Sequence, residues 1–297
     1  MTNASNLEPV AVIANTCLLG EGPVWDAGRK MICWLDILNG IIHQYSPGQN
    51  TYQTIEVNQM IGSIALCENG NFIAALQNGF GFIDKATGEL TMVADPENHL
   101  PGNRFNEGKC DPTGRFWAGT MALSEEPGAG NLYVIQNDLA PAKKIEDVSI
   151  SNGMAWSMDH RTFYYIDSPT REIVAYDFDE TSGHISNKRT IIKVAATDGS
   201  PDGMTIDNEG MLWVAHWDGW QVVRWNPDTG EKLSHIKFPV ARITSCTFGG
   251  DSLEDIYVTS AKVKLTEKEL EQQPLAGSLF VIRNCGFKGV PAFEFKV

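Results

Sequence analysis

Residues 153–167, GMAWSMDHRTFYYID, contain two strand signals separated by a polar turn, and this pattern recurs along the chain. Each copy opens on a small residue, and a turn rich in Gly, Asp or Asn separates its two apolar strands. The other copies are GPVWDAGRKMICWLD (22–36), GSIALCENGNFIAAL (62–76), GKCDPTGRFWAGTM (108–121), GMTIDNEGMLWVAHW (203–217) and a diverged SCTFGGDSLEDIYVTS (245–260). Successive copies start 40, 46, 45, 50 and 42 residues apart.

A third strand signal follows some copies, as in EIVAYDF (172–178) and QVVRW (221–225). A period of about 40–50 residues built from three or four strands is typical of a propeller blade. Six copies span roughly residues 17–283, so the sequence predicts an all-β, six-bladed β-propeller forming a single domain over 1–297. A β-sandwich is the alternative, but it would not repeat one turn motif at a near-constant interval.

Two further segments have expected places in this fold. The apolar run PVAVIA (9–14) is expected to pair with the last blade and close the ring. The segment TEKELEQQ (266–273) is the best helical candidate, with Glu and Lys side chains spaced for a solvated helix.

Composition excludes several classes of protein. The 297 residues carry 23 basic and 37 acidic side chains, a net charge of -14 that disfavours nucleic acid as a partner. No apolar run approaches the roughly 18 residues of a membrane span. The start, MTNASNLEPV, lacks the features of a secretory signal, so we expect a cytoplasmic protein.

The six cysteines form no C-x-x-C pair and most lie in apolar runs, which predicts buried, reduced thiols. Trp25, Trp117, Trp156 and Trp213 fall at core positions of their repeats and are expected to pack inside the blades.

The residues preceding the small residue of each repeat should face the central channel, because the first strand of a blade lines it. They are Glu21, Ile61, Glu107, Asn152, Asp202 and Thr244. Three of the six are acids, which are costly to bury unpaired, so a bound cation would make them tolerable. Oxygen ligands suit Ca²⁺, Mg²⁺ or Mn²⁺, and Zn²⁺ is also possible. The alternative is a water-filled channel with the same residues at strand starts.

Other catalytic motifs are absent from the sequence: we find no G-x-S-x-G, H-E-x-x-H or P-loop. His216 follows a strand beside Trp217 and Trp220, where it could reach the channel mouth and bind a ligand.

The chain resembles the senescence marker protein, gluconolactonase and luciferin-regenerating enzyme family. The matching stretches run in family order: GEGPVWD (20–26), NRFNEGKCDPTGRFWAGTM (103–121), ISNGMAWSMDHRTFYYIDS (150–168), PDGMTIDNEGMLWVA (201–215), TSCTFGGDSLEDIYVTSA (244–261) and GSLFVIRNCGFKGV (277–290). The resemblance implies a propeller with one divalent cation, Ca²⁺ being our first expectation and Zn²⁺, Mn²⁺ or Mg²⁺ the alternatives.

The resemblance also implies roles for individual residues. It places the metal ligands at Glu21, Asn152 and Asp202, with Asp202 also the general acid or base. It places substrate contacts at Arg104 and Asn106. Two positions depart from the family pattern: Glu107 replaces the usual Asp and is predicted to contact substrate, and Ser124-Glu125-Glu126 follows G-T-M where animal members carry one glutamate.

The implied activity is hydrolysis of a small-molecule lactone, a sugar-acid lactone first, by a cation-activated water with Asp202 as the general base. Three alternatives stay open: a calcium-binding regulatory protein without catalysis, a related propeller hydrolase acting on another ester or a phosphotriester, and a protein-interaction propeller. The sequence leaves the oligomeric state undetermined.

Overall fold

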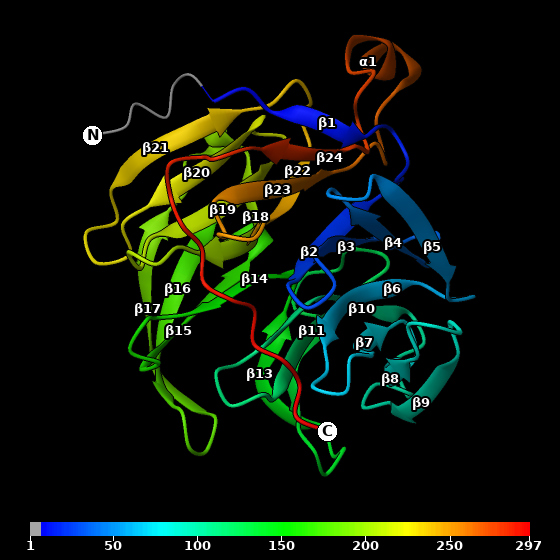
Figure 1. The fold of residues 1–297 in the computed structure, drawn as a ribbon. Coiled ribbons are helices and arrows are strands. Elements are labelled where there is room, and N and C mark those ends of the chain that lie inside the picture. Colours follow the sequence, from blue (N-terminus) through cyan, green and yellow to red (C-terminus); the bar gives the residue numbers. More distant parts are fainter. Residues whose placement is uncertain (1–6) are drawn as a thin grey trace.

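The computed structural model describes residues 7–297, in which six four-stranded antiparallel sheets form a ring (Figure 1). This six-bladed β-propeller confirms the predicted fold class. Blade 1 comprises β2 (Gly20–Asp26), β3 (Met31–Asp36), β4 (Ile41–Ser46) and β5 (Thr51–Glu56), and blade 2 comprises β6 (Ile61–Leu66), β7 (Phe72–Leu76), β8 (Gly79–Ile83) and β9 (Leu90–Ala94). Blade 3 comprises β10 (Asn103–Cys110), β11 (Phe116–Ala122), β12 (Gly130–Ile135) and β13 (Ala142–Val148).

The second half of the chain continues the pattern. Blade 4 comprises β14 (Ser151–Trp156), β15 (Thr162–Asp167), β16 (Glu172–Asp179) and β17 (His184–Lys193), and blade 5 comprises β18 (Ser200–Ile206), β19 (Leu212–Trp217), β20 (Gln221–Trp225) and β21 (Lys232–Lys237). Blade 6 comprises β22 (Ile243–Gly249), β23 (Asp255–Ser260), β24 (Leu279–Ile282) and β1 (Val10–Ile13). The strands predicted at 172–178 and 221–225 are β16 and β20.

Both ends of the chain contribute to blade 6, and this closes the ring as predicted. β1 pairs antiparallel with β24, with Val10 opposite Val281 and Ala11 opposite Phe280. The predicted helix is also present as α1 (Glu267–Gln272), in the connection between β23 and β24. A capping box between Thr266 and Glu269 satisfies backbone N–H groups at its start and explains where it begins.

The first strand of every blade packs against the first strands of both neighbouring blades, so these six strands line the central channel. Glycines allow this close approach. A Cβ on Gly153 would lie 2.6 Å from the Cβ of Met204, and one on Gly203 would lie 2.1 Å from the Oγ of Ser245. Contact between neighbouring blades therefore requires a glycine at these two repeat starts.

The core lies within and between the blades, and the aromatic residues expected there are buried. Trp25, Trp117, Trp156 and Trp213 are all shielded from solvent, as predicted. All six cysteines are buried and free, which confirms the expected thiols. Burial raises the pKa of the Cys33 thiol to about 12, so it stays protonated and acts as a small apolar side chain.

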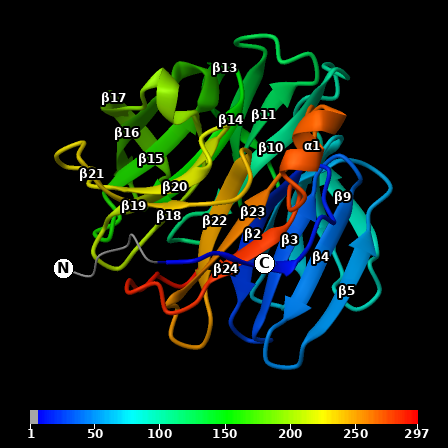
Figure 2. The same ribbon diagram turned by 90° about the horizontal axis from the view of Figure 1, so that it is seen from above.

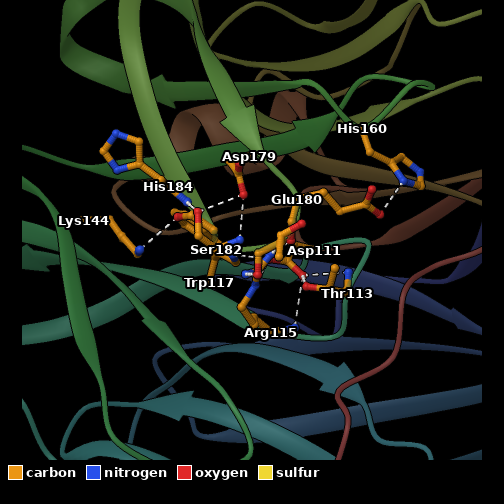
Figure 3. A network of polar contacts seen from close by, with 12 residues as sticks. Asp111, Thr113, Arg115, Trp117, Lys144, His160, Asp179, Glu180, Ser182 and His184 are labelled. Atoms are coloured by element: carbon orange, nitrogen blue, oxygen red, sulfur yellow. Dashed lines mark hydrogen bonds and ion pairs between the residues drawn. The ribbon is translucent and has the colours of Figure 1, made fainter.

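Buried aspartates stabilise the turns between the first and second strands of blades 3 and 5. In blade 3, Asp111 accepts hydrogen bonds from Arg115 Nε (2.6 Å) and Trp117 Nε1 (2.9 Å), and Arg115 Nη2 reaches the backbone oxygen of Glu180 in blade 4 (2.6 Å), as Figure 3 shows. In blade 5, Asp207 makes the same kind of contact with Trp213 and Arg224. Each of these buried carboxylates is paired and hydrogen-bonded, as stability requires.

Residues 287–296, named here the C-terminal strap, cross one end of the channel (Figure 1). The strap is held at blades 5 and 6 by hydrogen bonds from Asn208 N to Lys288 O and from Gly289 N to Leu253 O. On the other side of the ring it is held at blade 2, where Phe295 N donates to Leu66 O. Figure 2 shows the strap and α1 on different sides of the ring. Within residues 7–297, no helix is long and apolar enough to cross a membrane.

Candidate functional site

A β-bulge interrupts the first strand of every blade near its start, where the predicted site residues lie. In β18, Pro201 pairs with His216 and Met204 with Val214, so two residues of β18 face one of β19. Bulges re-aim side chains and bend the strand. The first residue of the bulge is Asp202 in blade 5, Asn152 in blade 4 and Asn106 in blade 3.

This register corrects one sequence alignment. The repeat equated Glu107 with Asn152 and Asp202 because each precedes a glycine, but Asn106 is their structural equivalent in blade 3. Glu107 is the second residue of its bulge, and a shift of one residue turns a side chain toward a different side of a strand. Glu107 accordingly lines a cavity at the strap end of the channel, whose lining includes neither Asn152 nor Asp202. Its predicted contact with substrate stays a prediction.

Three of the other predicted side chains, Arg104, Asn106 and Asn152, belong to one buried hydrogen-bonded group. Arg104 Nη1 donates to Asn106 Oδ1 (2.7 Å), and Asn106 Nδ2 lies 3.3 Å from Asn152 Oδ1. Asn152 Nδ2 donates to Ser168 Oγ (2.8 Å), which donates to Pro201 O (2.6 Å), the residue before Asp202. The structure thus links predicted substrate-binding and metal-ligating residues of blades 3, 4 and 5. Ser168, on the turn Ser168–Thr170, carried no sequence signal of its own.

Glu21 and Asp202 are buried carboxylates with few partners. Glu21 accepts one hydrogen bond, from Gly22 N (2.8 Å), and Asp202 interacts with the backbone N–H of Gly203. Burial raises the pKa of the Glu21 carboxyl well above its usual range, and the charge of Glu107 adds to the effect. Burial likewise raises the pKa of Asp202, with further contributions from Glu21 and Glu107. Neither carboxylate forms an ion pair within the described part of the chain.

The donor set of Glu21, Asn152 and Asp202 fits a hard divalent cation. Two buried carboxylates and an amide oxygen are the ligands that Ca²⁺, Mg²⁺ and Mn²⁺ prefer. A cation would offset both the burial and the repulsion that raise the pKa values of the two carboxyl groups. Over residues 7–297, no three His, Cys, Asp or Glu side chains are grouped closely enough to hold a metal ion. The expectation that Glu21, Glu107 and Asp202 surround one cation stays a prediction, although Glu107 is the second and not the first residue of its bulge.

His216 is placed differently from the sequence expectation of a channel-mouth position. It is fully buried in β19, its Nδ1 lies 2.8 Å from Asp198 O, and its ring stacks on Trp225. Burial lowers the pKa of His216 to about 4, so the ring is neutral at pH 7. Its Nε2 is buried without a hydrogen-bond partner in the described chain. Its predicted contact with substrate stays a prediction.

The stretch 124–126, which departs from the family pattern, lies between β11 and β12. Glu125 forms an ion pair with Lys264, from the connection between β23 and β24. Because blades 3 and 6 are opposite each other in a ring of six, this pair spans the end of the channel away from the strap. The charge of Glu125 also acts on Arg104, whose pKa burial lowers to about 10. The sequence showed that residues 124–126 depart from the family pattern, but it did not indicate that Glu125 pairs with Lys264.

Comparison with known proteins gives full-length matches. A family model described as SMP-30/Gluconolactonase/LRE-like region matches residues 19–262. Regucalcin from Danio rerio is 38% identical over 293 residues, covering 98% of this chain and 99% of that protein. Among solved structures, a calcium-binding regucalcin from Agrobacterium tumefaciens has a TM-score of 0.94 at 27% identity, with full coverage of both chains. A luciferin-regenerating enzyme has a TM-score of 0.91 at 30% identity, covering 98% of this chain and 100% of that one.

Proposed function

Since the chain belongs to the SMP-30/gluconolactonase/LRE-like family, we propose that it is a cation-dependent lactonase acting on sugar-acid lactones. The observation that carries the proposal is the pair of buried, nearly unpartnered carboxylates, Glu21 and Asp202, beside the hydrogen-bonded group of Arg104, Asn106 and Asn152. Buried groups with strongly perturbed pKa values gather at functional sites.

Glu21, Asn152 and Asp202 would hold the cation. When bound, a divalent cation polarises an ester carbonyl and makes water a better nucleophile near neutral pH. Ser168 Oγ accepts a hydrogen from Asn152 Nδ2, and Asn152 Oδ1, which accepts from Asn106 Nδ2 at 3.3 Å, keeps a second lone pair for a cation. Such supporting hydrogen bonds commonly fix the orientation of a metal ligand.

Arg104 and Asn106 would bind and orient the lactone. Arg104 Nη1 is used in hydrogen bonds to Phe105 O and Asn106 Oδ1, while the guanidinium has five donors in all. Donors therefore remain for the hydroxyl and carbonyl oxygens of a sugar lactone. Holding the ring in a reactive position is itself a large contribution to rate.

Asp202 would move the proton in the reaction. It takes a proton from the water that attacks the ring carbonyl and returns it to the ring oxygen as the C–O bond breaks. The products are one hydroxy acid per lactone, with all atoms of water retained.

A panel of aldonolactones in a pH-stat tests the proposal. The chelator-treated protein is assayed alone and after addition of Ca²⁺, Mg²⁺, Mn²⁺ or Zn²⁺. We expect hydrolysis to be lost on chelation and restored by at least one of these ions. Turnover that persists at full rate in the metal-free protein would refute cation dependence.

The second candidate function is cation binding without catalysis. It is favoured by the similarity to a regucalcin described as a calcium-binding protein, which matches over its whole length. Tight binding of one cation, without turnover of any lactone in the panel, would select this candidate over the lactonase.

A further inference from the structure

A cavity of about 950 Å³ occupies the strap end of the channel, below the candidate site. Loops joining first to second strands, at Lys30, His160 and Asp251, form its rim, and residues 290–294 of the C-terminal strap cover it. The size is that of a site for a small organic molecule. Arg104, Asn106 and Asp202 are not among its lining residues, so the cavity differs from the candidate lactonase site.

Apolar side chains form most of the wall. Trp25, Leu66, Trp156, Ile206 and Phe248 come from five different blades and surround the channel at this level. The strap adds Val290 and Phe293, and Phe293 packs edge-on against the His160 ring, with centroids 5.6 Å apart. A largely apolar wall of this kind suits the hydrocarbon part of a ligand.

One cationic group lies deep in this wall. Lys109 Nζ donates to Met204 O (2.6 Å), and an ammonium group has three hydrogens to donate. Lys109 forms no ion pair within 4 Å in the described chain, whereas Lys30 at the rim is paired with Asp251 at 3.0 Å. The side chain of Lys109 is half-buried, and because it is surrounded by protein, its exposed part faces the cavity rather than the outer surface.

Glu107 is the one acid that lines the cavity near Lys109. Its Oε2 atom is buried and has no hydrogen-bond partner in residues 7–297. Burial raises the pKa of Glu107, while the charge of Lys109 lowers it. The carboxyl group of Glu107 is thus a second polar group, besides that of Lys109, in the depth of the cavity.

We propose that this cavity binds an organic carboxylate with an apolar tail, such as a medium-chain fatty acid. The carboxylate pairs with Lys109 in the depth of the channel, and the tail contacts Trp25, Trp156 and Phe248 beneath the strap. A charge-assisted hydrogen bond in a site shielded from water is strong enough to fix the orientation of such a ligand. The inference does not depend on the proposed lactonase activity.

The test is a calorimetric titration of the full chain with decanoate, decanol and decylamine, below their aggregation concentrations and with chelator present. The chelator removes any cation that could itself bind a carboxylate at the candidate lactonase site. We expect one decanoate per chain, bound about tenfold or more tightly than decanol, with decylamine weakest. Tryptophan fluorescence should change on binding, since Trp25 and Trp156 line the cavity.

Two variants test whether Lys109 supplies the positive charge that binds the carboxylate. In Lys109→Met, decanoate and decanol should bind with affinities within about threefold of each other, while Lys30→Met should behave as wild type. Equal affinity of the three probes for wild type, or no saturable binding, would overturn the proposal. The wild-type comparison decides the matter even if Lys109→Met fails to fold. Retained preference for decanoate in a folded Lys109→Met would equally refute the role of Lys109.

Discussion

The two ends of β18 each carry a buried aspartate, and the two aspartates accept very different numbers of hydrogen bonds. Asp207, just beyond the strand, accepts hydrogen bonds from the backbone of Glu209 and Met211, from Trp213 Nε1 and from Arg224 Nε. Asp202, near its start, has only the neighbouring backbone of Gly203. In blade 3, Asp111 resembles Asp207, because it also accepts several hydrogen bonds (Figure 3).

The difference separates a structural acid from a functional one. Both side chains are buried, so burial alone distinguishes nothing. A buried carboxylate with several donors stabilises the fold that supplies them, whereas one left with almost none costs stability unless a ligand compensates it. Asp202 and Glu21 are therefore the acids at which we expect binding and chemistry.

The largest effect that the comparison predicts is on turnover. Asp202→Asn removes the proposed base and a proposed metal ligand, so kcat for lactone hydrolysis should fall by about 10²–10⁴-fold. A pH-stat assay of the cation-loaded protein measures this. Asp207→Asn, five residues away, should keep kcat per folded molecule within about threefold. Full turnover in Asp202→Asn would remove Asp202 from the mechanism.

For stability, we expect the larger loss in Asp207→Asn and the smaller in Asp202→Asn. Asp207→Asn leaves Nε of the buried Arg224 without its charged partner and should lower the free energy of unfolding by about 3 kcal/mol. Asp202→Asn replaces a buried carboxyl group that has almost no partners and should leave the stability of the cation-free protein unchanged or higher. Urea unfolding in chelator measures both. A loss of similar size in the two variants would show that Asp202 has structural partners after all.

A smaller effect is expected from the hydrogen bonds behind Asn152. Ser168→Ala removes the acceptor that orients its amide and the link to Pro201 O, so cation affinity should fall about tenfold. Thr170→Ala, on the same short turn but exposed, is the matched control. Calorimetric cation titration of both variants provides the readout, and equal affinities would mean that Asn152 does not act through Oδ1.

The last expected effect is on the pH dependence of stability. The pKa values of Glu21 and Asp202 are raised, so the cation-free native protein keeps protons that the unfolded chain releases above about pH 4. Its stability should therefore fall as pH rises from there, by at most about 1.4 kcal/mol per pH unit for each group. Denaturant unfolding from pH 5 to 8 in chelator should show a flatter profile in the Glu21→Gln/Asp202→Asn double variant. Identical profiles would contradict the proposed electrostatics.

Most of the fold was predictable because each repeat encodes its own blade. The glycine after Asn152 and Asp202 is required by contact with the next blade, so the fold itself maintains the pattern that the sequence displays. The C-terminal strap could not be predicted, since residues 287–296 carry no copy of the repeat. The strap is held by backbone hydrogen bonds and by apolar contacts of Phe287, Val290 and Phe295 with three different core clusters, which no local pattern indicates.

The site was predictable only in part. Repeat spacing located Asn152 and Asp202, and the family resemblance added Arg104 and Asn106. Glu107 was misaligned because a two-residue bulge offers two positions before a glycine, and only strand register distinguishes them. The pairing of Glu125 with Lys264 joins opposite blades, so no local pattern could indicate it.

Titration of Ca²⁺ into chelator-treated protein, followed by calorimetry, tests the central claim most directly. The comparison of the two aspartates predicts one ion per chain for wild type and for Asp207→Asn, and binding weakened about 100-fold or more in Asp202→Asn. Binding of equal strength in wild type and Asp202→Asn, or no binding in wild type, would contradict the assignment of the unpartnered carboxylates to a cation.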